Sequence, residues 1–272
     1  MNWSALDVSI LGPAFLAGLL VLATHVPMGM QVLDRGIVFV DLAIAQIASL
    51  GVIAADWMGW PAQGLQVQIA AVTAALGGAA LLSLTDRRAG RHQEALIGAS
   101  FVLAATGGIL LLASNPHGGE HLKDLLVGQI LWVDATGLLW LAALCVPVLL
   151  AWFGFGRRLG RFGFYALFAL AVTAAVQVVG VYLVFSSLII PALATHAMRG
   201  PRRLAWAYLV GALGYALGLG ASALLDLPSG AVIVWALALV AIVRGLMPIP
   251  PDPSPRTTSP AARRPPPPPS RA

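Results

Sequence analysis

The stretch Leu188-Ile189-Ile190-Pro191-Ala192-Leu193-Ala194-Thr195-His196-Ala197-Met198-Arg199-Gly200-Pro201-Arg202-Arg203 shows how this chain is built. An apolar run reaches a proline, a short segment of small residues follows, and arginines precede the next apolar run. Arginine-rich loops between apolar segments are typical of the cytoplasmic side of a membrane. The stretch therefore predicts a segment that leaves the bilayer, exposes a short stub over residues 191–203, and enters again. Such a stub offers a surface that a soluble partner could hold.

The composition agrees with this interpretation. Hydrophobic residues make up 59% of the chain and charged residues 10%, which is too apolar for a soluble domain of 272 residues. Helices satisfy their own backbone hydrogen bonds in hydrocarbon, and the alternating pattern of a membrane barrel is absent. We therefore predict an all-α, polytopic membrane protein with about eight transmembrane helices.

The apolar stretches cover residues 10–23, 37–55, 67–84, 95–113, 125–153, 162–191, 205–225 and 231–243. Residues 24–35 read as a polar loop. Residues 125–153 are too long for one ordinary span, and the polar residues 134–137 are expected to divide them into a short re-entrant or interfacial helix and a true span. Residues 162–191 begin and end beside arginines, so they are expected to cross twice, or to go part-way and return, with a bend near Gly180.

The distribution of charge predicts the orientation. With the N-terminus outside, all the arginines fall inside, and Asp56, Glu120, Lys123 and Asp226 fall outside. No basic segment precedes the first apolar stretch, so a cleaved signal peptide is not expected. Residues 1–247 are assigned to the transmembrane domain. Residues 248–272, rich in proline and arginine, are predicted to form a disordered cytoplasmic tail.

Several function classes are excluded. Lys123 is the only lysine and lies in no glycine-rich phosphate-binding motif, so another chain would have to hydrolyse any ATP that is used. The net charge of +5 comes from loops and tail without interleaved aromatic residues, which argues against nucleic-acid binding. No Ser/His/Asp arrangement supports an enzyme, and the single cysteine, Cys145, cannot form a disulfide within the chain.

Asp41 is the first candidate for chemistry. An ionisable residue inside an apolar span is a functional-site hypothesis by default, although Asp41 could instead cap its helix or pair with Arg35. Gln46 is the second candidate. It lies five positions later, so a local bend would be needed for both side chains to contact one ion.

An outer loop supplies a second group of candidates. His117, Glu120 and His121 carry the ligand types that suit zinc and manganese, and His117 and His121 would share one face of a helical turn. The alternative is a solvated loop without a specific ligand. His25, beside Pro27, reads as a solvated residue at the cytoplasmic interface.

Several blocks together resemble the permease subunits of zinc, manganese and iron ATP-binding-cassette (ABC) importers. The blocks occur in order over nearly the whole chain before the tail: Val38–Gln46 with Leu50-Gly51, Glu94–Gly98, Asp124–Leu131, Val178-Val179-Gly180 with Leu188–Ala192, and Asp226–Ala231. The resemblance implies the architecture of the cobalamin-type (type II) importer permeases. It also implies a homodimer in the bacterial plasma (inner) membrane, with a pore between the subunits.

The resemblance further implies an ATP-driven importer of divalent metal ions, with zinc first and manganese second. A cytoplasmic ABC ATPase would use ATP and dock on the stub, and an extracytoplasmic protein would deliver the metal. No cofactor would be bound permanently. The candidate coupling residues are Pro191, Ala192, Thr195, His196, Arg199, Arg202 and Arg203.

Two departures from the family pattern stand out. The family places aspartate and histidine four apart in the second helix, whereas this chain has Leu42 and Gln46 at those positions and Asp41 one residue earlier. The basic segment Arg157–Arg161 is also shorter than the family's cytoplasmic loop. Three rivals remain: a permease of the same class that carries a metal chelate, an ion-coupled carrier that works without an ATPase, and a structural membrane subunit without a pore.

Overall fold

The computed structural model describes residues 7–60, 64–89, 92–113, 118–155, 158 and 160–247. All regular elements in these ranges are helical: α1 (Val8–Arg35), α2 (Val40–Trp57), α3 (Leu65–Ala89), α4 (Gln93–Leu112), α5 (Gly118–Val127), the 3₁₀ turn η3 (Ile130–Trp132), α6 (Ala135–Phe155), α7 (Gly160–Ala194), α8 (Pro201–Leu225) and α9 (Ser229–Leu246). Eight of these helices, all but α5 and η3, are long and apolar enough to cross a membrane. The predicted fold class is confirmed, whereas the tail 248–272 lies outside the described residues.

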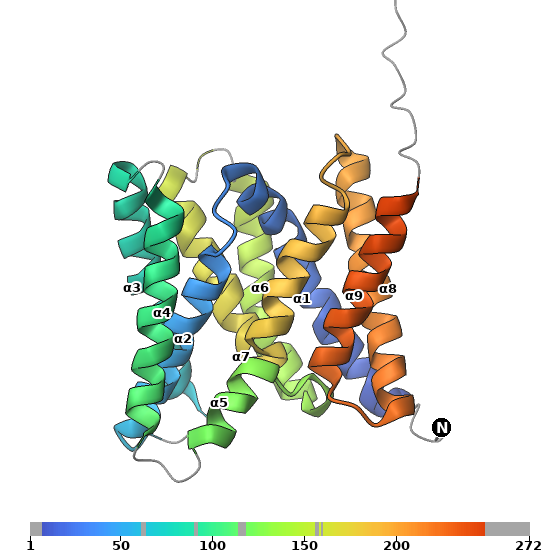
Figure 1. Ribbon diagram of the computed structural model, residues 1–272. Helices are drawn as coiled ribbons and strands as arrows, with labels where there is room; N and C mark the ends of the chain where they lie inside the picture. Colours follow the sequence, from blue (N-terminus) through green and yellow to red (C-terminus); the bar gives the residue numbers. More distant parts are fainter. Residues whose placement is uncertain are drawn as a thin grey trace, which may run out of the picture.

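Helix α7 is the centre of the molecule. It packs against α1, α2, α3, α5, α6, α8 and α9. Figure 1 shows α2, α3 and α4 grouped on one side of α7, and α1, α8 and α9 grouped on the other. In an apolar 18-residue segment of α7, 72% of the residues are buried, compared with 17% in the corresponding segment of α6. Helix α6 therefore exposes far more apolar side-chain surface than α7 does.

The chain bends at Gly180 inside α7, as the sequence predicted. Gly180 has φ 78° and ψ 163°, values that an α-helix cannot contain. Figure 1 shows the first limb descending to the level of α5 and the second limb returning to the edge from which the first began. The sequence predicted that residues 162–191 either cross twice or go part-way and return, with a bend near Gly180. In the structure, the chain enters the bundle from one edge, turns at Gly180 and returns to the same edge.

Two other segments pack closely against the turn in α7. A Cβ on Gly180 would lie 2.3 Å from the backbone nitrogen of Gly128, which follows α5. A Cβ on Gly230, at the start of α9, would lie 2.4 Å from the carbonyl oxygen of Val127. The Gln129 backbone N–H donates to the Val178 carbonyl at 3.3 Å. We call this meeting of residues 127–129, 178–180 and 230 the outer junction.

The prediction of a polar loop over residues 24–35 is wrong, because α1 continues to Arg35. Pro27 lies inside the helix and has no N–H for the carbonyl of Ala23. The Tyr208 hydroxyl of α8 donates to that carbonyl at 3.0 Å and so replaces the missing bond. Membrane helices tolerate proline when a neighbouring helix satisfies the freed carbonyl in this way.

The ion pairs gather helix ends at one edge of the bundle. Arg203, at the start of α8, contacts Asp34 near the end of α1 at 3.3 Å. Arg161, at the start of α7, contacts Asp86 near the end of α3 at 3.5 Å. This edge, the upper one in Figure 1, is the one predicted to be cytoplasmic and is called the arginine edge below.

Candidate functional site

Asp41 lies in the first turn of α2 and is completely buried. Neither of its carboxylate oxygens has a hydrogen-bond partner among the described residues. Its position at a helix N-terminus favours negative charge, but an unpaired buried carboxylate remains costly. Arg35 does not supply the missing partner: its guanidinium carbon lies 3.9 Å from the centroid of the Phe164 ring instead. A cation arriving from outside the chain would satisfy these oxygens.

The start of α2 meets a second carboxylate. Phe39 occupies the N-cap position without a side-chain cap, and its backbone N–H donates to Glu94 Oε1 of α4 at 3.1 Å. The other oxygen of Glu94 is buried and has no hydrogen-bond partner in the described part of the chain. Two carboxylates therefore lie at the same end of α2 with unfilled acceptor capacity, and only one of them, Asp41, was selected from the sequence. The signal for the other was an acidic residue just ahead of an apolar run.

Gln46 is also nearly buried, with 7% of its surface exposed. Helix α2 is continuous from Val40 to Trp57, so the bend needed to bring Asp41 and Gln46 to one ion is not present. The two side chains stay on different faces, because five residues turn a helix by well over one revolution.

The predicted outer cluster is only partly covered by the structure. His117 lies outside the described residues. Glu120 and His121 fall within α5, but their side chains are not among those described. The described part of the chain contains no group of three or more His, Cys, Asp or Glu residues that could hold a metal ion. The cluster therefore stays a prediction.

His25 corrects another expectation, since it is completely buried within α1 rather than solvated. Its Nδ1 lies 2.9 Å from the Val21 carbonyl and 2.9 Å from Thr24 Oγ1, while Nε2 has no partner among the described residues. The misassignment follows from ending α1 too early, because a histidine two residues before a proline looked like part of a loop.

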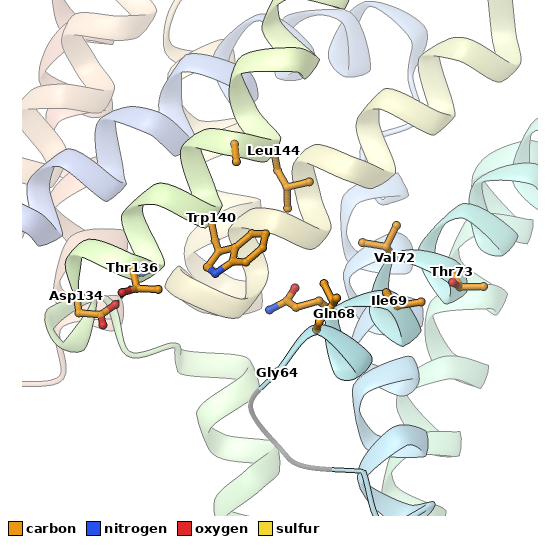
Figure 2. A pocket seen from close by; sticks show the side chains of 12 residues that line it. Gly64, Gln68, Ile69, Val72, Thr73, Asp134, Thr136, Trp140 and Leu144 are labelled. Carbon is orange, nitrogen blue, oxygen red and sulfur yellow. Dashed lines mark hydrogen bonds between the residues drawn. The ribbon is translucent and has the colours of Figure 1, made fainter.

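A cavity of about 770 Å³ lies between the N-terminal halves of α3 and α6, away from the arginine edge. Figure 2 shows Gln68 of α3 and Trp140 of α6 projecting into it, with Asp134 and Thr136 at the start of α6. Behind the cavity, the Gln68 side-chain amide donates to Gln177 Oε1 of α7. Sequence analysis did not select these residues, although a glutamine inside an apolar run was a visible signal.

Two further polar atoms of α7 lie without partners near this bond. Gln177 Nε2 and Thr173 Oγ1 are buried and have no partner among the described residues. Thr173 and Gln177 are four positions apart and so share one face of α7. The interior surface of α7 is therefore polar at the level of the cavity.

The stub at the arginine edge has a buried and an exposed part. Pro191, Ala192 and Thr195 are buried, and the Thr195 hydroxyl donates to the Pro191 carbonyl at 2.9 Å. His196, Arg199 and Arg202 are exposed, and Arg203 binds Asp34. A partner could reach only the second group directly, so the buried residues could act only by shaping the stub.

Solved structures share this fold. The chain is similar to the structure of PsaBC from Streptococcus pneumoniae in complex with Fab, with a TM-score of 0.69 and 20% identity over 86% of this chain and 90% of that one. It is also similar to an inward-facing structure described as a metal-chelate type ABC transporter, with a TM-score of 0.62 and 17% identity over 85% of this chain and 84% of that one. No curated protein sequence matches the chain.

The family comparison covers nearly all of the described residues. The model of the ABC 3 transport family matches residues 7–160 and 153–247, which include every helix described above. The chain therefore belongs to the ABC 3 transport family, and the predicted family resemblance is confirmed.

Proposed function

We propose that this chain is the permease subunit of an ATP-driven importer of divalent metal ions, with zinc as the first candidate cargo and manganese as the second. The observation that carries the proposal is Asp41: a fully buried carboxylate with two unpartnered oxygens inside a membrane-spanning helix. Carboxylate oxygens bind both zinc and manganese. In a transport protein, a weakly satisfied intramembrane acid is suited to bind a passing cation and release it.

The partners that we propose follow from the sequence motifs and the exposed charges of the chain. It has no phosphate-binding loop, so a cytoplasmic ABC ATPase would supply the energy and contact the exposed residues His196, Arg199 and Arg202. The arginine edge would face the cytoplasm and the N-terminus the outside, in the plasma membrane of a bacterium. An extracytoplasmic metal-binding protein would deliver the ion, and two copies of the chain would enclose the pore.

The cavity favours one alternative cargo. A volume of about 770 Å³ far exceeds the space that a bare ion needs and lies within the range of organic ligand sites. Trp140 and Gln68 would give a metal chelate an aromatic surface and an amide to contact. A chelate importer is therefore the second candidate function.

Asp41→Asn tests the role of the buried carboxylate, because it preserves size and removes the charge. We expect zinc uptake into cells or proteoliposomes to fall by about tenfold or more, the usual scale for weakening a metal site. The matched control is Asp56→Asn, which makes the same change near the opposite end of α2. Unchanged uptake in the Asp41 variant, with normal amounts of protein in the membrane, would eliminate the proposed role.

The same assay separates the alternatives. Trp140→Ala should leave uptake of the free ion intact if the cargo is the ion alone, and should impair uptake of a chelated metal if the cargo is a chelate. Full transport by the purified chain without any ATPase would instead support the ion-coupled carrier.

A further inference from the structure

Arg244 stands apart from the other arginines of the described chain. It lies in the last turn of α9, and only 5% of its surface is exposed. Two ion pairs at the same edge involve side chains with substantial exposure, such as Asp34 and Arg161. Burial of a charged guanidinium is costly unless neighbouring groups accept its hydrogen bonds or stabilise its charge.

The contacts of Arg244 reach two other segments. Its Nη2 donates to the Met198 sulfur at 3.0 Å, and its guanidinium carbon lies 4.8 Å from the centroid of the Trp206 ring of α8. Nη1 donates to the Met247 carbonyl at 3.4 Å, just beyond the end of α9. Its Nε has no partner among the described residues. The side chain therefore connects the ends of α8 and α9 to Met198.

Met198 belongs to the non-helical part of the stub, residues 195–200, between α7 and α8. It is nearly buried, with 6% of its surface exposed, and its N–H donates to the Thr195 carbonyl at 2.9 Å. A second contact, between Arg203 at the end of the stub and Asp34, holds α8 to α1 and is open to solvent, because the Asp34 side chain is 62% exposed. Exposed pairs of this kind are weak, whereas the contact between Arg244 and Met198 is shielded from solvent.

We propose that Arg244 is a positioning residue that holds the stub in one orientation, through Met198, against the ends of α8 and α9. A displacement of the stub by a bound ATPase is then transmitted to α8 and α9 rather than absorbed by loose backbone. The part of this inference that concerns coupling rests on the proposed function of the stub as the ATPase contact. The hold itself is a property of the isolated chain.

The hold can be measured on the purified permease alone. Cys145 is the only cysteine and is buried, so a Cys145→Ala background with Ala197→Cys places one spin label on an exposed position of the stub. We expect Arg244→Gln to increase the mobility of that label. The matched control is Arg161→Gln, which removes an arginine from the same edge far from the stub in sequence. Equal mobility in the Arg244 variant and its parent would overturn the proposal.

Two other variants guard against loss of folding. Met198→Leu keeps the volume of the side chain and removes the sulfur acceptor, so it should also increase mobility, by a smaller amount. Arg244→Lys keeps the charge without the planar fork and should fall between wild type and Arg244→Gln. A label that is equally immobile in Met198→Leu and in its parent would remove Met198 as the point of contact and overturn the proposal.

Coupling is tested with the ATPase added. We expect Arg244→Gln to retain the co-purifying ATPase but to lower metal transported per ATP hydrolysed by about fivefold or more, the scale of a typical coupling energy. Unchanged transport per ATP would overturn the coupling role even if the label becomes mobile. If wild-type permease binds no ATPase at all, the proposed function fails, while the spin-label result still decides whether Arg244 holds the stub.

Discussion

The two ends of the second limb of α7 are held in opposite ways. At the outer junction, backbone meets backbone: a Cβ on Gly128 would lie 2.2 Å from the carbonyl carbon of Val179. At the stub, side chains make the hold, through Arg244 and Met198. The limb between them, residues 181–194, is about 21 Å long at the usual helical rise. A backbone anchor at the junction and a side-chain anchor at the stub suit a segment that pivots at the junction and transmits movement of the stub to α8 and α9.

The strongest test of this contrast is Gly180→Ala. The new Cβ would overlap backbone atoms that no rotamer change can move, and φ 78° is unfavourable for alanine, so we expect about 4 kcal/mol or more of destabilisation and little folded protein. The measurement is the yield of monodisperse protein in size-exclusion chromatography. Gly220→Ala in α8 is the control, because a Cβ there meets nothing within 4 Å. Normal yield of Gly180→Ala would show that the junction is adaptable, and the contrast would disappear.

A much smaller effect is expected at the arginine edge. Arg203 and Asp34 lie 3.3 Å apart, and Asp34 is largely exposed, so removal of the pair should lower stability by about 1 kcal/mol or less. Arg203→Gln, Asp34→Asn and the double variant form a cycle that isolates the pair, with thermal unfolding as the measurement. High salt should reduce the coupling further. A coupling energy several times larger would mean that this ion pair also holds the arginine edge firmly, and the contrast with the outer junction would weaken.

The smallest effect concerns the outer end of α1. Asp7 caps this helix and accepts a 2.8 Å hydrogen bond from the Ser9 N–H, which lowers the pKa of the carboxyl from its usual value. Because the folded pKa is depressed, the contribution of the cap is present above the ordinary pKa near 3.8 and is lost as pH falls through the folded value. The protection factor of the first turn of α1 against hydrogen exchange, which corrects the exchange rate for the intrinsic effect of pH, should therefore fall in acid, and Asp7→Ala should lower it at neutral pH. Asp7→Asn is the control, because it keeps a side-chain acceptor for the Ser9 N–H. Its protection at neutral pH should match that of the parent chain.

The sequence predicted the architecture well because membrane insertion imposes strong rules on composition. Long apolar runs, flanking arginines and the glycine at position 180 predicted the spans and the bend in α7. The course of α1 was not predicted, because Pro27 is accommodated by Tyr208, which lies 181 residues later. No local pattern reveals such a partner.

The candidate site was predicted less completely. Asp41 could be selected because charge inside an apolar run is rare, and the structure places it in a fully buried position. The approach of Glu94 to the start of α2 depends on how α2 and α4 pack, which single-sequence patterns do not determine. The same holds for Gln68 and Gln177, which come from different helices and meet only in the fold. Local chemistry was readable from the sequence, whereas pairing between helices was not.

The gathering of arginines at one edge also determines how the chain would be digested. Trypsin cleaves after lysine and arginine, and Lys123 is the only such residue predicted for the outer side. In sealed vesicles that keep the cellular orientation, trypsin outside could cut the chain only within α5, where Lys123 is exposed. In inverted vesicles it would instead meet Arg199 and Arg202 on the stub. One protease applied to two vesicle preparations thus gives two different fragment patterns, each of which identifies the face that is open to solvent.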